Sequence, residues 1–415
     1  MNESKPTLKI LLSAYACEPN RGSEPGVGWE WATRMAKHHE VHVLTRSNNR
    51  QMIEAELGRD WRPGSPRFIY LDLPAWVLKL KRCGICTVFI YYLLWQMLAR
   101  WHARRLVKAV DLIHHVTFNS FRFPGMWWFC KKPVVLGPLG GSSLAASQFR
   151  RCFGNRWWLE RLRTFSLMFW KANLWTLLSF YSSDCILTVD DDLTKRFRDI
   201  GLNSREMLET ALPFELEADP AEIPADSKRD FLLVGNLEPW KAWQITFEAF
   251  AQAQRQGMQG ARLKVVGTGR QTAAAMARAE TLGIAGSVDF LGKQPRDVVW
   301  QLMARARGLV FSSVRDTSGN VVIEAMGLCC PVICFKHQGV EIITDDSCAF
   351  RIPPADWDIS VSGFATAMLA LSADNRLVGS MGSAGRARIM NAFIWNKKIE
   401  AMLEIYQRVT GHAEV

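Results

Sequence analysis

Hydrophobic and polar positions follow the same pattern twice along this chain. An apolar run at residues 8–12 leads into a segment with three glycines, a helical periodicity through Trp31 and Met35, and a second apolar run within residues 40–46. A buried strand, a glycine-rich loop, a helix and a strand in this order are typical of a nucleotide-binding α/β unit with a parallel sheet. We therefore expect the chain to begin with such a unit.

Further strands are predicted at residues 110–118, 132–141 and 185–189, the last followed by a helix. The three aspartates 190–192 stand where that helix begins. They could form a metal cluster, but no His or Cys lies nearby, and acidic residues favour helix N-termini. We interpret them as caps.

A polar stretch rich in Pro and Glu, residues 213–230, is interpreted as an interdomain linker. Beyond it the α/β pattern restarts, and the buried strands of a second unit are predicted at residues 230–237, 262–269, 288–292, 308–313 and 331–335. The chain thus consists of two similar halves.

Two segments interrupt this pattern, residues 76–105 and 150–181. Both mix Trp, Phe and Leu with Lys and Arg. The apolar core of the first is shorter than the ~20 residues that a spanning helix needs. We predict amphipathic helices that dip into an anionic membrane surface. The alternative is that the two segments pack against each other as ordinary core.

Composition and charge narrow the possible partners. The chain has 415 residues, 48% of them hydrophobic and 22% charged, which suggests two globular domains. The net charge of +11 suits nucleic acid, an anionic membrane or a phosphorylated substrate, and the 17 Trp favour the membrane. The polar residues 1–9, with a proline, do not resemble a secretory signal, so a cytoplasmic protein is expected.

The stretch RDTSGNVVIE, residues 315–324, carries two carboxylates eight positions apart, Asp316 and Glu324. If a helix starts near Ser318, the amides of Gly319 and Asn320 lie at its positive end. Asp316 would precede that end and Glu324 would lie about a turn and a half inside. This arrangement could hold a phosphate between two acids that bind hydroxyl groups.

A second candidate site lies in the first half, where open α/β sheets bind ligands at the ends of their strands. The glycine-rich loop expected there is a candidate acceptor or phosphate loop, with the residues Gly22, Glu24, Gly26 and Gly28. It does not spell the GxGxxG of dinucleotide-binding enzymes. His114 and His115 end a predicted strand, and either could be an acid, a base or a substrate ligand, or simply a packed histidine.

Several segments together resemble the retaining glycosyltransferases of family 4. They are SAYACEPNRGSEPGVGWEWA, HHVTF, GPLGG, LLVGNLEPWKAW, VVGTGR, RDTSGNVVIEAMGLCCPVI and, near the C-terminus, FIWNKKIEAMLEIYQRV. The resemblance covers nearly the whole chain, and the two-acid segment is its most specific part. It implies the α/β GT-B architecture, in which two Rossmann-like domains face a central cleft and a C-terminal helix crosses back to the first domain.

The chain departs from the family pattern in its site segments. The first acid, usually Glu, is the shorter Asp316, and the Gly-Phe-Gly that usually follows it is replaced by residues 317–319. Asn236 stands in place of an Arg and Ala242 in place of a Gly, whereas Lys241 is retained.

The resemblance implies roles for these residues. Lys241 would stabilise the leaving phosphate, Glu324 would bind the ribose hydroxyls, and Asp316 would contact the donor sugar. His115 completes the predicted catalytic set. The predicted donor-binding residues are Asn236, Lys241, Gly267, Gly269, Arg270, Ser318, Gly319, Asn320 and Glu324. No metal and no cofactor are expected, because Lys241 and the helix dipole would replace a divalent ion and the leaving phosphate would help deprotonate the acceptor.

The expected domains are an acceptor domain at residues 1–212, the linker at 213–230, a nucleotide-sugar domain at 231–390 and the crossing helix at 391–415. The predicted function is sugar transfer from a nucleotide sugar to a lipid-linked oligosaccharide acceptor, peripheral to the inner face of the cytoplasmic membrane. The alternatives are a sugar-nucleotide epimerase or glycan phosphorylase of the same architecture, a degenerate membrane-bound homologue, or a basic scaffold. No nucleic-acid partner is expected, because no nucleic-acid motif accompanies the basic residues.

Overall fold

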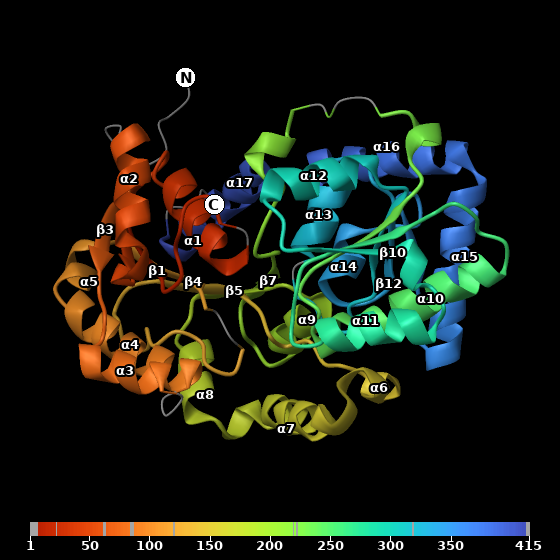
Figure 1. Cartoon of the computed structure of the whole chain (residues 1–415). Helices are drawn as coiled ribbons and strands as arrows, with labels where there is room; N and C mark the ends of the chain where they lie inside the picture. Colours follow the sequence, from red (N-terminus) through yellow and green to blue (C-terminus); the bar gives the residue numbers. More distant parts are fainter. Residues whose placement is uncertain are drawn as a thin grey trace. The chain divides into compact units, whose positions relative to one another are not determined.

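The computed structural model describes residues 7–21, 23–60, 64–83, 87–118, 121–218, 220, 223–317 and 319–411. The chain forms two compact α/β units (Figure 1). Unit 1 comprises residues 1–142, 165–209 and 399–415, and unit 2 comprises residues 143–164 and 210–398. The two units differ from the expected domain limits. Residues 143–164 and 210–212, assigned to the first domain from the sequence, belong to unit 2, as do the expected linker and residues 391–398 of the expected crossing helix.

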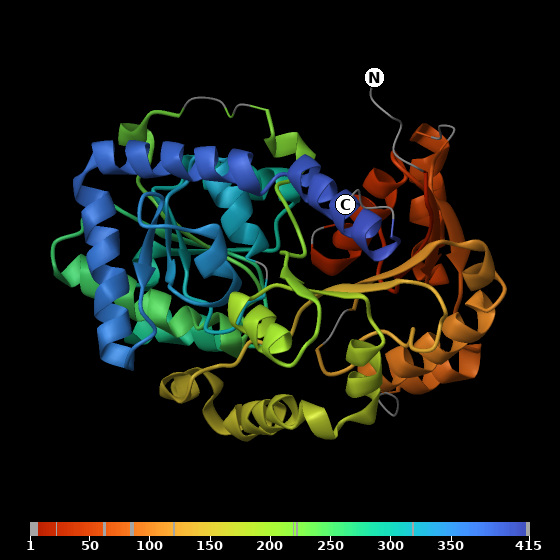
Figure 2. The ribbon, with the colours of Figure 1, turned by 180° about the vertical axis from the view of Figure 1, so that it is seen from behind.

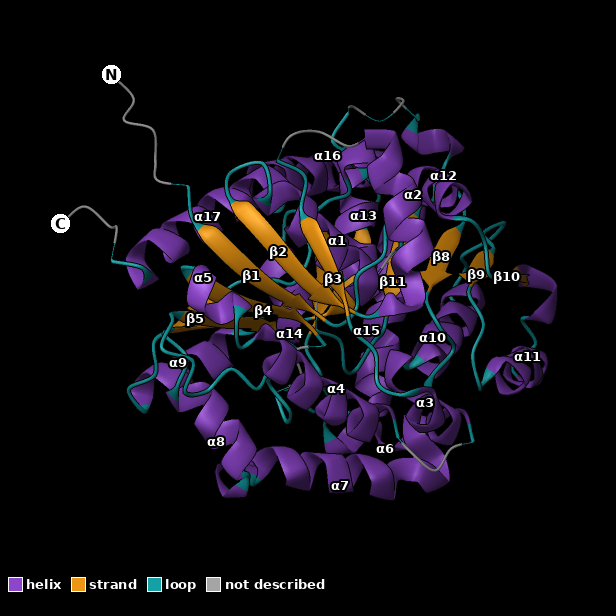
Figure 3. Cartoon of the chain, turned by 90° about the vertical axis from the view of Figure 1, so that its left-hand side faces the viewer, coloured by secondary structure: helices purple, strands orange, loops and turns teal. Residues whose placement is uncertain are grey.

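Unit 1 is built on a parallel sheet of seven strands in the order β3-β2-β1-β4-β5-β6-β7 (Figure 3). The strands are β1 Lys9–Ala14, β2 Glu40–Thr45, β3 Arg67–Tyr70, β4 Leu112–Thr117, β5 Val134–Leu139, β6 Cys185–Thr188 and β7 Ser204–Glu206. The order reverses between β1 and β4. Strands β1, β4, β5 and β6 confirm the predicted strands, and their apolar side chains are buried on both faces of the sheet.

The helices of unit 1 connect these strands. They are α1 Ser23–Met35, α2 Arg50–Asp60, α3 Ala75–Arg82, α4 Val88–Ala103, α5 Leu106–Ala109, α8 Leu174–Tyr181 and α9 Asp191–Asp199. The Asp190 carboxylate accepts a hydrogen bond from the Leu193 amide at 3.1 Å, which confirms that this aspartate caps α9.

The segment predicted at 76–105 forms α3 and α4, which pack side by side (Figure 1). Helix α4 has two different faces. Tyr91, Tyr92 and Trp95 are fully buried in the core of unit 1, whereas Phe89 and Trp101 are exposed. The segment is therefore amphipathic, as predicted, and its buried face forms ordinary core.

The segment predicted at 150–181 is divided into three helices, α6 Arg150–Phe153, α7 Trp157–Met168 and α8. Exposed apolar side chains continue along it, including Trp158, Phe165 and Phe169. Over the described part of the chain, we find no helix with the length and hydropathy needed to cross a membrane.

Unit 2 is built on a parallel sheet of six strands in the order β10-β9-β8-β11-β12-β13. The strands are β8 Phe231–Val234, β9 Leu263–Val266, β10 Val288–Gly292, β11 Gly308–Phe311, β12 Val332–Phe335 and β13 Ala349–Ile352. The order reverses between β8 and β11. Every strand predicted from the sequence in this half is present, which confirms the second α/β unit.

Seven helices pack around the sheet of unit 2 within the described part of residues 243–392. They are α10 Trp243–Arg255, α11 Thr272–Thr281, α12 Arg296–Arg305, α13 Asn320–Gly327, α14 Gln338–Ile343, α15 Trp357–Ala373 and α16 Asn375–Ala392. Helix α15 packs against α10, β12 and β13 (Figure 2).

The last helix, α17 Trp395–Val409, begins in unit 2, and its residues from 399 onward belong to unit 1. Tyr406 of this helix is fully buried, and its hydroxyl lies 2.6 Å from Nδ1 of His114 on β4. The second nitrogen of His114 contacts the Gly137 carbonyl at 2.9 Å. His114 therefore fastens the C-terminal helix to the first sheet.

Candidate functional site

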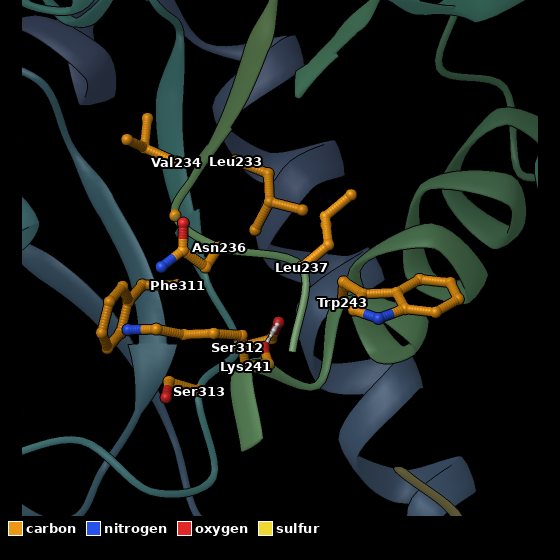
Figure 4. A pocket seen from close by; sticks show the side chains of 10 residues that line it. Leu233, Val234, Asn236, Leu237, Lys241, Trp243, Phe311, Ser312 and Ser313 are labelled. Carbon is orange, nitrogen blue, oxygen red and sulfur yellow. Dashed lines mark hydrogen bonds between the residues drawn. The ribbon is translucent and has the colours of Figure 1, made fainter. Parts of the chain in front are cut away.

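The main candidate site lies where the strand order of unit 2 reverses. The loops that follow β8 and β11 meet there, at the carboxyl ends of two parallel strands, which is where open α/β sheets bind ligands. Together they line a pocket (Figure 4). The pocket residues used below are Asn236, Lys241, Phe311, Ser312 and Ser313.

Lys241 is the central cation of this pocket. It ends a single 3-10 turn, Pro239–Lys241, and its extended side chain places Nζ 5.0 Å from the centre of the Phe311 ring (Figure 4). The Ser312 hydroxyl donates to the Lys241 carbonyl at 3.0 Å, and the Val314 amide donates to the Trp240 carbonyl at 2.9 Å. The two loops are thus joined, and the ammonium group is held over the pocket.

Asp316, on the loop after β11, is the partner of Lys241. Its Oδ2 pairs with Lys241 Nζ, and its Oδ1 accepts a hydrogen bond of 3.3 Å from the Gly319 amide. Gly319 has a φ of 55°, a left-handed conformation that suits glycine, and it caps α13. The Asp316 carboxylate therefore binds both groups that were expected to bind a phosphate, namely the Lys241 ammonium group and the N-terminus of α13. Ser318 lies outside the described residues.

Asn320 and Asn236 add amide groups to this region. Asn320 is the first residue of α13, and its buried Oδ1 has no hydrogen-bond partner among the described residues. An unsatisfied buried acceptor has a free-energy cost that a donor from a ligand would remove. Asn236 lines the pocket, pointing its amide toward the space above Lys241 (Figure 4).

Glu324 lies one turn into α13 and is largely buried, with 15% of its side chain exposed. Its Oε1 pairs with Arg296 Nη2 at 3.2 Å. Burial raises the pKa of Glu324, while the pairing with Arg296 opposes that rise. The position agrees with the expected carboxylate near the start of the helix, and its partners explain how an acid is accommodated among apolar residues.

Gly267 and Gly269 were predicted to bind a ligand, but the structure gives them a packing role. A Cβ on Gly267 would collide with the Gly235 carbonyl, and one on Gly269 with the Leu237 carbonyl. The loops after β8 and β9 therefore approach each other so closely that only glycine fits.

Arg270, also a predicted donor ligand, points elsewhere. Its guanidinium pairs with Glu238 at 2.7 Å, and it lines a separate pocket with Arg151 and Arg156. The structure thus does not bring Arg270 to the Lys241 pocket.

The glycine-rich loop predicted in the first half is instead the start of helix α1. Gly22 lies outside the described residues, while Glu24, Gly26 and Gly28 are in the first turns of the helix. A Cβ on Gly26 would collide with the Arg21 carbonyl, and one on Gly28 with the Ala16 carbonyl. The glycines thus allow the helix to pack tightly against the loop before it, which explains why the expectation of an open loop was wrong.

Glu24 lies where the strand order of unit 1 reverses. The Phe118 amide, just beyond β4, donates a hydrogen bond to Glu24 Oε1. Burial raises the pKa of Glu24 to about 7, and this hydrogen bond opposes the rise. A carboxyl group that titrates near neutral pH at a switch point can accept or hold a proton at physiological pH.

His115, predicted as a catalytic residue, is fully buried inside unit 1. Its Nε2 lies 2.9 Å from the Tyr92 hydroxyl and its Nδ1 lies 2.9 Å from the Ser13 hydroxyl. Burial lowers its pKa to about 3. These contacts correspond to the alternative interpretation, a packed and hydrogen-bonded histidine, because neither nitrogen is directed at a space for substrate.

Three further residues support the Asp316 loop and were missed in the sequence. Gln338 accepts a hydrogen bond from the Asp316 amide at 2.8 Å, and His337 contacts the Ser313 carbonyl at 3.0 Å. Arg315 pairs with Glu160. The residues in each of these contacts are far apart in the sequence, and no sequence motif predicts the contacts.

Comparison with known proteins finds similarity over this part of the chain. Residues 228–374 match the family model described as glycosyl transferases group 1. The chain is 28% identical over 204 residues to a D-inositol 3-phosphate glycosyltransferase of Segniliparus rotundus, covering 47% of this chain and 43% of that protein. It is 24% identical over 237 residues to the lipopolysaccharide core biosynthesis glycosyltransferase LpsE of Rhizobium meliloti, covering 55% and 66%. The matched region thus spans about half the length of these relatives.

The fold of the whole chain also has relatives. HepE of Anabaena, solved in complex with UDP and glucose, superimposes with a TM-score of 0.62 at 15% identity, covering 95% of this chain and 99% of that one. The two parallel sheets with their helices are the GT-B fold, which confirms the predicted architecture.

Proposed function

Because residues 228–374 match the family model described as glycosyl transferases group 1, we propose that this chain transfers a sugar from a nucleotide-sugar donor to a saccharide acceptor. One observation carries the proposal: a lysine and the N-terminus of α13 converge on one anion, the Asp316 carboxylate, at the switch point of unit 2. A diphosphate offers the same charge to the same groups. The complex of HepE with UDP and glucose supports a nucleotide sugar as the donor class.

In the proposed reaction the donor diphosphate replaces the Asp316 carboxylate beside Lys241. The released carboxylate can then accept hydrogen bonds from the donor sugar, while Glu324 accepts them from the ribose. Negative charge grows on the phosphate oxygen as its bond to the anomeric carbon breaks, and Lys241 together with the Gly319 amide stabilises that charge.

We propose that the configuration of the sugar is retained. The acceptor oxygen forms its bond to the anomeric carbon on the face that the phosphate leaves, and its proton passes to the leaving phosphate oxygen. This route needs no protein base, in agreement with the buried position of His115. We also propose that no divalent ion is required, since Lys241 and the N-terminus of α13 would stabilise the charge on the phosphate oxygens that such an ion would otherwise bind.

The acceptor side of the proposal rests on the exposed surface of unit 1. An apolar face runs along α3, α4 and the segment leading into α8, and includes Trp76, Phe89, Met97, Trp101, Phe165 and Phe169. The loop between β4 and β5 joins these elements: Arg122 lies over the Phe89 ring at 5.3 Å, and Trp128 packs on Trp175 at 5.2 Å. This face is therefore continuous within unit 1.

Charge complements this apolar face. Residues 76–105 contain six lysines or arginines and no acidic residue. Basic residues beside exposed Trp and Phe suit an anionic headgroup layer. We propose that the chain lies on such a membrane and that its acceptor is a lipid-linked saccharide, as in the assembly of lipopolysaccharide or a related surface glycan.

The first test is a panel of nucleotide sugars, beginning with UDP-glucose, assayed for thermal stabilisation and slow donor hydrolysis. We expect one donor to act on the wild type and on Lys264→Ala, a matched control whose lysine pairs with Asp230 on the same sheet. Lys241→Ala and Glu324→Ala should lose both responses. If no nucleotide sugar changes the stability of the wild type, the donor proposal is wrong, and a degenerate homologue becomes the better description.

A further inference from the structure

Helix α7 has an exposed apolar side and a buried charge on the opposite side. Trp158, Leu159 and Leu162 are 62%, 46% and 58% exposed, whereas Glu160 is 5% exposed. A buried carboxylate is destabilising unless cations or hydrogen-bond donors satisfy its oxygens. The partners of Glu160 therefore show what this side of the helix is built to hold.

Both oxygens of Glu160 are used within unit 2. Oε1 pairs with Arg163 at 3.1 Å, one turn further along α7, and Oε2 pairs with Arg315. Arg315 immediately precedes Asp316, and its guanidinium stacks 4.9 Å from the ring of Trp240, the neighbour of Lys241. Glu160 is thus linked to Asp316 through Arg315, and to Lys241 through Arg315 and Trp240.

A second set of contacts holds the Asp316 peptide itself. Arg163 donates to the Ser143 carbonyl at 2.7 Å, and the Ser143 hydroxyl reaches the Asp316 carbonyl at 3.4 Å. On the other side Gln338 accepts from the Asp316 amide at 2.8 Å and donates to the Leu144 carbonyl at 3.1 Å. The backbone of Asp316 is therefore held by the segment that Glu160 organises.

We propose that Glu160 is a positioning residue for the sugar transfer: through Arg315 it fixes the backbone of Asp316, so that only the carboxylate moves when the donor enters. The inference rests on the proposed function. It assigns a role in the donor site to a segment outside the span that the family model matches, residues 228–374. A carboxylate that changes partners needs a fixed backbone, because a small displacement of an orienting group is costly in rate.

The test compares Glu160→Gln with the wild type in the hydrolysis of the donor found by the panel. Glutamine keeps the shape and removes the charge. We expect kcat to fall about 10- to 100-fold while KM for the donor changes less than about three-fold, because Lys241 and Glu324 still bind it. Amide hydrogen exchange at residues 312–317 should become faster, a readout that needs no catalysis.

Glu248→Gln is the matched control. Glu248 also pairs with two arginines in unit 2, Arg278 at 2.6 Å and Arg151 at 3.8 Å, neither of which adjoins Asp316 in the sequence. This control should leave kcat and the exchange of residues 312–317 unchanged. Arg315→Gln gives a second variant, and the double variant should be no slower than either single one, because both remove the same link.

The outcomes separate the two proposals. A folded Glu160→Gln protein with wild-type kcat and wild-type exchange overturns the positioning role, even if the wild type transfers sugar. Independent, multiplying losses in the Glu160→Gln and Arg315→Gln variants overturn it as well. If the wild type hydrolyses no donor but exchange at 312–317 still rises in Glu160→Gln alone, the link is real and the proposed function is what fails.

Discussion

The two switch points of this molecule share one backbone plan and differ in their side chains. In unit 2 the ends of β8 and β11 present an ion pair, Lys241 and Asp316. In unit 1 the corresponding ends of β1 and β4 are packed with aromatic rings: Tyr92 lies 4.5 Å from Phe118 and 5.2 Å from Tyr15, centroid to centroid. The doubly wound sheet thus determines where a binding site can form, and the residues of the loops determine which ligand that site can bind.

The acidic residues at the two switch points also have different partners. The acid of unit 1, Glu24, has an amide partner and a pKa raised by burial to about 7, whereas the acid of unit 2, Asp316, has a lysine partner. A fixed cation suits a diphosphate, whereas the strand ends of unit 1 carry no such cation among the contacts above, only packed aromatic rings and one titratable acid. This contrast supports a donor site in unit 2 and an acceptor site in unit 1, and the following predictions test it.

Removal of the cation should have the largest effect. Lys241→Ala leaves the leaving phosphate with the helix amides alone, and we expect donor hydrolysis to fall about 10²- to 10³-fold, as for other groups that stabilise developing charge. Steady-state kinetics with the donor from the panel would measure this loss. If the Lys241→Ala protein were as active as the Lys264→Ala protein, unit 2 would need no cation at this position. The proposed difference between the two switch points would then be wrong.

Glu24 should make the stability of unit 1 depend on pH. In the unfolded chain its pKa is the ordinary 4.5, and in the folded chain it is about 7, so the folded state binds more protons in between. The free energy of unfolding should therefore fall as pH rises from 4.5 to 7, by about 3 kcal/mol from this group. Urea unfolding at several pH values should show that Glu24→Gln removes this fall.

An exposed acid of the same unit provides the control for that pH series. Glu54, 51% exposed and paired with Arg50, should behave like the wild type when replaced by Gln. Identical pH profiles for Glu24→Gln and Glu54→Gln would mean that Glu24 is ionised when folded, and the proposed contrast between the two acids would be lost.

Glu324 should contribute to nucleotide binding with a smaller effect. Glu324→Ala removes the acceptor of the ribose hydroxyls, so we expect the affinity for UDP to fall about ten-fold, and Glu324→Gln, which keeps one acceptor oxygen, to fall less. Isothermal titration with UDP checks both values. Glu341→Gln, an exposed acid on α14, is the control. Equal UDP affinity in all variants would place the ribose elsewhere.

The smallest effect is expected at the apolar face of unit 1. Trp101 is 59% exposed, and Trp101→Ser should weaken partition into vesicles that contain anionic lipid about five-fold, roughly 1 kcal/mol. Ile359→Ser, equally exposed in unit 2, should change nothing. Vesicle sedimentation at two salt concentrations measures this partition, and tighter binding of the chain to DNA than to vesicles would favour a nucleic-acid partner instead.

The sequence was sufficient to predict the strands other than β3, β7 and β13, the GT-B fold and the segments that carry Lys241 and Asp316, because periodicity and one dense motif carry that information. The prediction from the sequence was wrong where a glycine-rich segment was interpreted as a loop. Gly26 and Gly28 lie in helix α1, and they are glycine because a Cβ there would collide with the carbonyls of Arg21 and Ala16, a contact that composition does not reveal. The packed position of His115 depends likewise on Tyr92 and Ser13, residues that only the folded sheet brings together.

Glu160 shows the same limit at longer range. Its partner Arg315 is 155 positions away, and α7 reads from the sequence as a membrane helix of the first domain. Nothing local distinguishes a buried acid from a solvated one on such a helix. Long-range ion pairs of this kind become visible only in three dimensions.

The division of the chain has a practical consequence for dissecting the protein. Unit 2 consists of two separate pieces, residues 143–164 and 210–398. A recombinant fragment that begins at 210 would contain Lys241, Asp316 and Glu324 but would lack Glu160. Supplying the 143–164 peptide in trans should therefore restore order to the 312–317 loop, so that unit 2 could be reassembled from its two pieces by fragment complementation.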